Sequence, residues 1–173
     1  MRQFAKYIAF LLMASSIGYF TIKIGVGYKK KKDAGARIQN LPDATFKNTL
    51  GNPVNLQDFD HSKPIVIIYF HPDCEHCQYE AGEVARNASA FQNSQLIMVS
   101  ATDSIPEIEK FASDYHLHEI DNIQILVDGH GQFKKVFGKA VLPSVYIYSN
   151  DRKLKKRFPG EVKIEAVLME LNN

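Results

Sequence analysis

The alternation of hydrophobic and polar positions divides most of the chain into short strands and helices. The run from Ile65 to Phe70 is apolar throughout and rich in β-branched residues, which is typical of a central strand covered on both faces. After it, apolar residues recur three and four positions apart through residues 77–91 and again through 108–115, a spacing that predicts two helices. Ser104 and Pro106 suit the start of the second helix.

Further strands and one more helix follow from the same kind of pattern. Strands are predicted over residues 45–49, 54–56, 96–99, 123–127, 145–148 and 153–158, and a closing helix over 164–171. The turns Leu50 to Pro53 and Asn150-Asp151 join two pairs of these strands into hairpins. Strands that alternate with helices and end in a hairpin predict an α/β domain with a central mixed β-sheet flanked by helices.

The N-terminal segment differs in composition from the rest. From Tyr7 to Tyr28 the only charge is Lys23, and these 22 residues exceed the ~20 that a transmembrane helix needs. We therefore interpret residues 1–28 as a transmembrane anchor or signal segment, residues 29–41 as a basic linker, and residues 42–173 as the globular domain. A small-residue cleavage site would fit at Ala14-Ser15-Ser16, but the apolar character continues past it, which favours an uncleaved anchor.

The orientation of this anchor follows from two indications that conflict. Lys29 to Lys32 come after the apolar segment and outnumber the charges before it, so a positive-inside count keeps the domain in the cytoplasm. The very short N-terminal tail and the thiol chemistry described below point the other way. We expect a membrane-anchored protein whose catalytic domain is extracytoplasmic, on the periplasmic side of a bacterial membrane.

Composition and charge exclude several classes of protein. Hydrophobic residues at 45% and charged residues at 23% describe an ordinary globular chain, and a formal net charge of +2 is too small to indicate nucleic acid binding. Two cysteines provide no framework of structural disulfides, so the fold must rest on its core. The length of 173 residues fits one domain with an appendage, and we expect a monomer.

Both cysteines, Cys74 and Cys77, follow directly after the apolar strand. A thiol acts as a nucleophile only as the thiolate. If a helix starts at Cys74, with Asp73 as its N-cap, that sulfur faces unpaired backbone amides and the positive end of the helix dipole, which both stabilise an anion. Cys77 lies one turn further in. We therefore predict that Cys74 attacks a substrate and that Cys77 resolves the mixed disulfide.

The two residues between the cysteines are candidates for tuning the pair. A protonated His76 would stabilise the thiolate and make the disulfide more oxidising, whereas Glu75 and Asp73 would oppose this effect. The direction of electron flow therefore stays open. The expected substrates are protein dithiols or disulfides, and no cofactor is needed because electrons pass from sulfur to sulfur.

Several motifs resemble those of a known group of proteins. They are Gly51-Asn52-Pro53-Val54-Asn55-Leu56, Phe70, Cys74-Glu75-His76-Cys77, Glu80 and Leu142-Pro143-Ser144. From about Pro42 to Leu171 the chain is similar to the thioredoxin-like domains of the TlpA/ResA/redoxin group, extracytoplasmic thiol-disulfide oxidoreductases carried on a membrane anchor or signal. The resemblance implies that Pro143 is the cis-proline that faces the dithiol.

Two positions depart from the pattern of that group. Asp73 stands where an aromatic residue is common, and no acidic residue interrupts Ile65 to Phe70 to act as a buried proton acceptor. Glu75 is our candidate for that role.

Two other functions use the same residues. Four metal-binding donors, His71, Cys74, His76 and Cys77, fall within seven residues, which would suit a zinc or copper metallochaperone. The adjacent His76 and Cys77 point in different directions, which counts against it. In a thiol peroxidase, Cys74 would be oxidised to a sulfenate, but the threonine expected three residues before it is His71.

Overall fold

The computed structural model describes residues 15–27 and 35–172, and the chain separates into two units after residue 36. In the first unit, residues 15–27 form a helix on which large apolar side chains such as Phe20 and Ile24 are exposed. Within the described ranges, no helix is both long enough and apolar enough to cross a bilayer. The expected span from Tyr7 to Tyr28 lies partly outside these ranges, so it stays a prediction.

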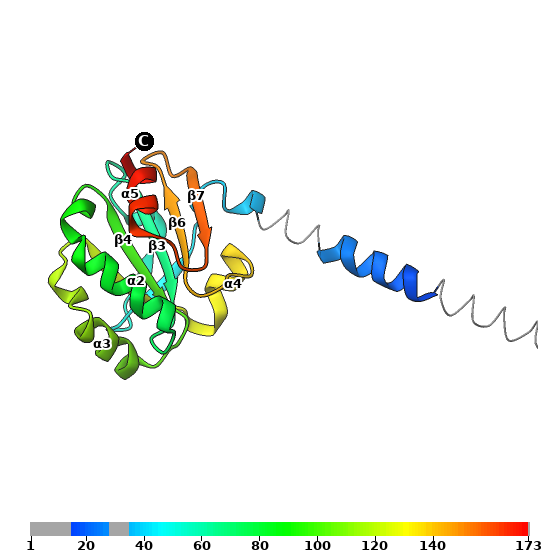
Figure 1. The fold of residues 1–173 in the computed structure, drawn as a ribbon, viewed down its shortest axis with the longest axis horizontal. Helices are drawn as coiled ribbons and strands as arrows, with labels where there is room; N and C mark the ends of the chain where they lie inside the picture. The colour runs from blue at the N-terminus through cyan, green and yellow to red at the C-terminus, as the bar shows by residue number, and fades with distance from the viewer. Residues whose placement is uncertain (1–14, 28–34, 173) are drawn as a thin grey trace, which may run out of the picture. The chain divides into compact units, whose positions relative to one another are not determined.

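A seven-stranded mixed sheet forms the centre of the second unit, in the order β2-β1-β5-β4-β3-β6-β7 (Figure 1). The strands are β1 (Thr45–Asn48), β2 (Pro53–Asn55), β3 (Ile65–Phe70), β4 (Gln95–Ser100), β5 (Ile123–Val127), β6 (Ser144–Tyr148) and β7 (Leu154–Pro159). β3, β4 and β5 run parallel, whereas β1 and β6 run antiparallel to their neighbours. The helices are α2 (Glu75–Arg86), α3 (Ile105–Asp114), α4 (Gln132–Phe137) and α5 (Ile164–Asn172). The predicted α/β architecture with a mixed sheet is confirmed.

The sheet separates two hydrophobic cores. On one face, Val66, Ile68 and Phe70 of β3 pack with residues of α2, α3 and α5. On the other face, Ile65 and Ile67 pack with α4 and with the chain that precedes β1. Figure 1 shows α2 and α3 on the side of the sheet opposite to α4. β3 is therefore apolar at every position because successive residues enter different cores.

The helix boundaries near the dithiol differ from those expected. Asp73 is exposed and does not cap α2; the N-cap is Cys74. Ser104 occupies the N-cap of α3, but its side chain makes no capping hydrogen bond. α2 ends at Arg86 because Asn87 leaves the helical region and its side-chain amide donates to the carbonyl of Glu83 at 2.9 Å. The apolar spacing beyond it belongs to a short 3-10 turn, Ala88–Phe91.

Two parts of the domain were not expected from the pattern. α4 was not predicted, although Phe133 and Phe137 bury one of its faces. The domain also begins at Arg37 rather than at residue 42, because Ile38 and Leu41 are buried in the core that α4 covers. Residues 39–41 run beside the start of β7, where the Leu154 amide donates to the carbonyl of Gln39 at 2.9 Å.

Candidate active site

The two thiols lie where β3 gives way to α2. Cys74, at the N-cap, is half-buried, and its amide donates to the carbonyl of His71 at 3.1 Å. The carbonyl of Cys74 accepts hydrogen bonds from the amides of Cys77 and Gln78, each at 2.9 Å. This cap holds Cys77 one turn into the helix with a side chain that is only 1% exposed. The two cysteines therefore differ in access, and Cys74 is the one that a substrate can reach.

Cys77 is a thiol that resists losing its proton. Burial is the main cause that raises its pKa far above the ordinary value, and the hydrogen bond and charge of Cys74 and the charge of Glu80 add to it. A thiolate in this position would be stripped of water and would face other anions. Cys77 can act as a nucleophile only if a neighbouring group accepts its proton.

Glu80 provides a carboxyl group in this buried environment. It follows Cys77 by three residues on α2 and is 2% exposed, and within the described part of the chain its Oε2 atom has no hydrogen-bond partner. Burial, and then the negative charge of Glu161, raise the pKa of Glu80 to about 8. Glu75, expected as the buried acceptor, is instead exposed in the first turn of α2. The buried carboxyl beside the dithiol is therefore that of Glu80.

His76 makes a contact that connects α2 with the end of β7. Its Nδ1 atom lies 2.5 Å from Oε2 of Glu161, and both side chains are exposed. Glu161 follows Gly160, whose positive φ of 92° turns the chain and whose amide donates to the carbonyl of Pro143 at 2.9 Å. Glu161 thus contacts the exposed imidazole of His76, and its negative charge contributes to the raised pKa of the buried Glu80.

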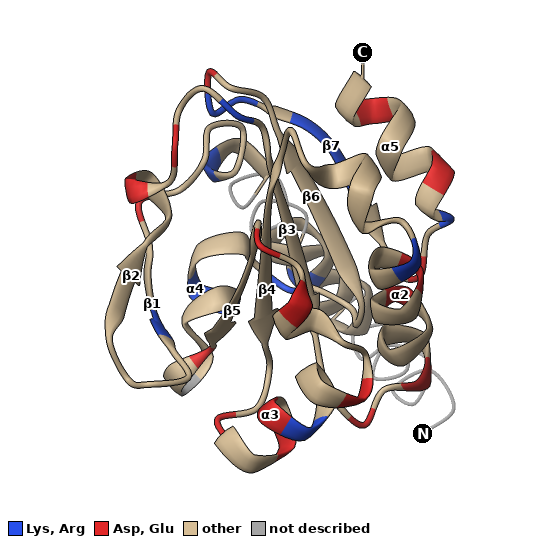
Figure 2. Cartoon of the chain, turned by 90° about the vertical axis from the view of Figure 1, so that its left-hand side faces the viewer, with Lys and Arg blue, Asp and Glu red and all other residues tan. Residues whose placement is uncertain are grey.

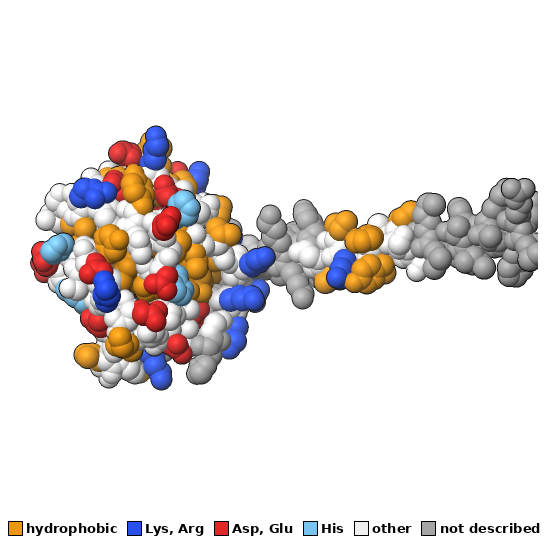
Figure 3. Space-filling view, turned by 60° about the horizontal axis from the view of Figure 1, so that its bottom comes forward, with side chains coloured by type: hydrophobic (Ala, Val, Ile, Leu, Met, Phe, Trp, Pro, Cys, Tyr) orange, Lys and Arg blue, Asp and Glu red, His pale blue; other side chains and the backbone are white. Residues whose placement is uncertain are grey.

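Pro143 lies in the loop before β6 and completes the surroundings of the dithiol. The Leu142-Pro143 peptide bond is cis, as the resemblance implied. The carbonyl oxygen of Leu142 lies 4.0 Å from the Sγ atom of Cys74, and Val141 next to it is 51% exposed. Figure 3 brings this end of the domain forward and shows acidic and histidine side chains among hydrophobic ones.

Comparison with known proteins assigns this chain to a family. The sequence model of the AhpC/TSA family matches residues 38–157. The chain belongs to the AhpC/TSA family. It is 21% identical over 170 residues to the thiol-disulfide oxidoreductase ResA of Geobacillus thermodenitrificans, a match that covers 97% of this chain and 93% of that relative.

Solved structures that resemble this AhpC/TSA-family chain share its thioredoxin-like fold. One is a secreted disulfide oxidoreductase of Mycobacterium tuberculosis, described as homologous to E. coli DsbE, with a TM-score of 0.65, 18% identity, and coverage of 79% of this chain and 97% of the other. Another is the peroxidoxin BcpB of the same organism, with a TM-score of 0.64, 19% identity, and coverage of 77% and 94%. The fold alone therefore does not separate disulfide exchange from peroxide reduction.

The donors considered for a metal site do not come together in this AhpC/TSA-family domain. Among the described residues, no group of three or more histidine, cysteine or acidic side chains is placed to hold a metal ion. His71 uses its Nδ1 atom to accept a hydrogen bond from the amide of Asp73 at 3.2 Å, and His76 pairs with Glu161. Of the remaining histidines, His61, His116 and His118 are exposed, and the side chain of His130 lies outside the described part.

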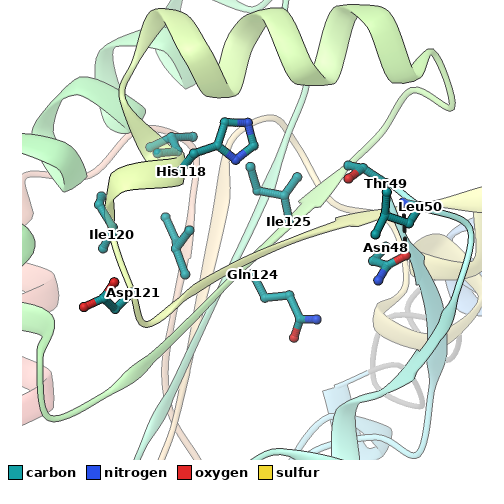
Figure 4. Close-up of a pocket in the computed structure, with 10 residues that line it drawn as sticks. Asn48, Thr49, Leu50, His118, Ile120, Asp121, Gln124 and Ile125 are labelled. Carbon is teal, nitrogen blue, oxygen red and sulfur yellow. Dashed lines mark hydrogen bonds between the residues drawn. The ribbon is translucent and has the colours of Figure 1, made fainter.

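The domain also has hollows away from the dithiol. One of about 320 Å³ lies between the hairpin residues 48–50 and the chain from Leu117 to Ile125 (Figure 4). There His118 is near Ile125, and Asp121 lies beyond Ile120. Another of about 430 Å³ is lined by Asp60, Lys63, Gln92, Gln95, Asp121 and Asn122. Neither includes a residue of the dithiol site.

Proposed function

We propose that this AhpC/TSA-family chain is a thiol-disulfide oxidoreductase that exchanges electrons with dithiols or disulfides of other proteins. One observation carries the proposal: an accessible Cys74 at a helix N-cap lies beside a buried Cys77, and the same helix carries the buried Glu80, whose Oε2 atom has no hydrogen-bond partner among the described residues. Such an arrangement separates the roles of attacking and resolving thiol and supplies a proton acceptor.

In the reducing direction, the Cys74 thiolate attacks one sulfur of a substrate disulfide, and the other substrate sulfur leaves as a thiolate. Cys77 then gives its proton to the Glu80 carboxylate and attacks the Cys74 sulfur. The Cys74–Cys77 disulfide forms, the second substrate sulfur leaves, and the substrate has gained two electrons. A carboxyl whose pKa is raised to about 8 can accept and return a proton near neutral pH. The same steps in reverse oxidise a substrate dithiol.

The loop around Pro143 would orient the substrate, and His76 would tune the pair. The Leu142 carbonyl lies next to the Cys74 sulfur. A peptide chain bound along this loop would therefore hold its own sulfur where the Cys74 sulfur can attack it. A cationic His76 stabilises the Cys74 thiolate and hence the reduced form. Glu75, exposed in the same turn, opposes that effect and is in reach of a partner protein.

We also propose that residues 7–28 anchor the protein in a membrane, with the domain outside the cytoplasm. The support is the apolar sequence of that segment and the exposure of the large apolar side chains on residues 15–27. The similar oxidoreductase of Mycobacterium tuberculosis is secreted, which agrees with this placement. Protease added to intact spheroplasts should digest the domain, and resistance to digestion would contradict the topology.

The activity is tested by comparing two reactions of the purified full-length protein. We expect catalysed reduction of a disulfide-bonded protein substrate with dithiothreitol as the electron source, and loss of this catalysis in Cys74→Ser. The same preparations are assayed for thiol-dependent consumption of hydrogen peroxide. Peroxide turnover that exceeds disulfide reduction would replace the proposal with a thiol peroxidase, which is the other chemistry that occurs among the structural neighbours.

A further inference from the structure

The charges of the domain are segregated along the sequence. Residues 129–160 contain eight lysines and arginines but only one acidic residue, Asp151. Residues 58–128 contain thirteen acidic residues and three basic ones. In Figure 2, acidic positions lie on α2, α3 and α5 and in loops near β2, whereas β7 and α4 carry basic positions. The small net charge of the chain therefore results from an acidic segment and a basic segment that nearly cancel each other.

Six basic residues form what we call the basic face: Arg37, Lys134, Lys135, Lys139, Lys155 and Arg157. Arg157 connects β7 with the segment that follows α4, because its Nη2 atom donates to the carbonyl of Lys139 at 3.3 Å. Its guanidinium also lies 5.1 Å from the centre of the Tyr146 ring. Arg37 and the four lysines are exposed.

The basic face has little internal compensation. Among the described residues, the salt bridges of this region involve Lys156 with Glu170, and none involves a member of the basic face. Figure 3 shows several Lys and Arg side chains gathered along one side of the domain. A surface of unpaired positive charges on one side favours an extended anionic partner.

The chain enters the domain at this same face. Ile38 and Leu41 are buried in the core that α4 covers, and the Leu41 amide donates to the carbonyl of Arg152 at 2.6 Å. The link from residue 28 to residue 36 contains nine residues and can span at most ~30 Å. Arg37, a member of the basic face, therefore stays within about this distance of residue 28 along the chain.

We propose that the basic face docks on the anionic headgroups of the membrane that holds the N-terminal segment, an inference that rests on the proposed anchoring. Each lysine or arginine near an anionic bilayer adds to the attraction between protein and membrane, and this attraction falls off within a Debye length. Because α2 covers the opposite face of the sheet from α4, docking through the lysines of α4 would leave α2 on the side of the sheet away from the lipid.

Lysine footprinting of the full-length protein in nanodiscs tests this orientation. One set of discs contains phosphatidylcholine only, and the other contains phosphatidylcholine with about one third phosphatidylglycerol. Acetylation of Lys134, Lys135, Lys139 and Lys155 is measured by mass spectrometry, with Lys47 and Lys110 as controls, because both are exposed and lie on other elements. We expect acetylation of the four lysines to fall about threefold or more in anionic discs and to recover at 1 M salt, where the Debye length is ~3 Å.

The outcomes separate docking from anchoring. Association with both kinds of disc and selective protection in anionic discs supports both proposals, whereas association with anionic discs only supports docking and contradicts the anchor. Equal acetylation in the two kinds of disc, equal protection of the control lysines, or absence from anionic discs overturns docking. The triple variant Lys134→Glu/Lys135→Glu/Lys139→Glu should lose the protection of Lys155, while Lys47→Glu/Lys110→Glu should keep it. Displacement of the protein from anionic discs by single-stranded DNA would instead identify a nucleic acid surface.

Discussion

At the scale of single residues, the site depends on a buried acid, Glu80, whose Oε2 atom has no hydrogen-bond partner among the described residues. Such a group is costly unless it stays neutral, and its pKa rises accordingly. With a pKa raised to about 8, Glu80 can therefore exchange a proton with Cys77 near the pH where thiol exchange occurs. Burial of the Glu80 carboxyl both lowers the stability of the folded state at high pH and prepares the group for proton transfer. The role of Glu80 can therefore be measured from the stability of the folded protein, without a substrate.

Glu80→Gln should change how stability depends on pH. Because burial raises the pKa of Glu80 from 4.5 to about 8, the folded state binds more protons than the unfolded state between these values, and its stability falls as the pH rises. The variant cannot ionise. We expect similar stability for the two proteins near about pH 4 and a variant more stable by roughly 5 kcal/mol near about pH 9, measured by urea unfolding.

Glu165→Gln is the matched control, since Glu165 is exposed on α5. If Glu80→Gln and Glu165→Gln showed the same dependence on pH, Glu80 would not be a buried acid of the folded state.

His76→Ala should lower the reduction potential of the Cys74–Cys77 pair. His76 as a cation favours the thiolate of the reduced form, so its removal favours the disulfide. We expect a decrease of roughly 30 mV, about 1.4 kcal/mol for a two-electron couple, in an equilibrium titration with glutathione. His118→Ala is the control, because His118 also pairs with a glutamate, Glu109 at 3.0 Å, but lies on another element. An unchanged potential in His76→Ala would exclude the histidine as a redox tuner.

At the scale of elements, strands and helices with strong periodicity could be predicted from the sequence, and short or capped ones could not. β3 is apolar at every position because both of its faces are buried, and the two hairpins follow from their turn residues. α4 has only six residues, preceded by Gly129 and Gly131, which is less than the window in which a helical period can be recognised.

The candidate site shows the same division. Cys74 and Cys77 are evident from their spacing, and the cis bond at Pro143 follows from the resemblance. The burial of Glu80 depends on the strands and helices packed around it, which no local pattern reports. Glu161 is 85 residues from His76 along the chain; their contact exists because β7 ends beside Pro143. The contact between His76 and Glu161 could have been predicted only by first pairing β6 with β7 in the correct register.

Arg152 connects the turn before β7 to the loop before β3, and its replacement should destabilise the domain. Its guanidinium donates to the carbonyls of Lys63, Phe59 and Asp60 at 2.9, 2.8 and 2.7 Å. Arg152→Ala leaves these acceptors unpaired, so we expect a loss of about 3 kcal/mol in the free energy of unfolding, measured with urea. Lys153→Ala, at an exposed neighbour, should change it by less than about 0.5 kcal/mol.

A second substitution separates the side chain from the backbone at this position. Arg152 has a positive φ of 61°, which glycine adopts without strain. Arg152→Gly should therefore cost about 1 kcal/mol less than Arg152→Ala. Wild-type stability in Arg152→Ala would mean that the guanidinium contacts contribute nothing.

At the scale of the whole molecule, the chain consists of an apolar N-terminal segment and a domain that begins at Arg37. The four residues that follow Arg37 are part of the fold, although their sequence reads as a linker. Ile38 and Leu41 are 3% and 4% exposed, and the hydroxyl of Tyr148 donates to the carbonyl of Ile38 at 3.1 Å. The segment that connects the domain to the rest of the chain is thus anchored in the core.

Two truncations test this boundary. A chain that starts at Arg37 should unfold at the same temperature as the full-length domain, whereas one that starts at Pro42 loses two buried side chains and about 4 kcal/mol of stability. Thermal unfolding followed by circular dichroism gives both values. Equal transition temperatures for the two truncations would show that residues 37–41 are a linker after all.

The division of labour between the two thiols is tested most directly by trapping mixed disulfides. Each single variant, Cys74→Ser and Cys77→Ser, is incubated with a protein disulfide substrate, and the products are separated without reduction. Cys77→Ser retains the accessible sulfur and lacks the resolving one, so it should accumulate a mixed disulfide through Cys74, while Cys74→Ser should accumulate little. Equal trapping by both variants, or trapping by neither, would contradict the mechanism.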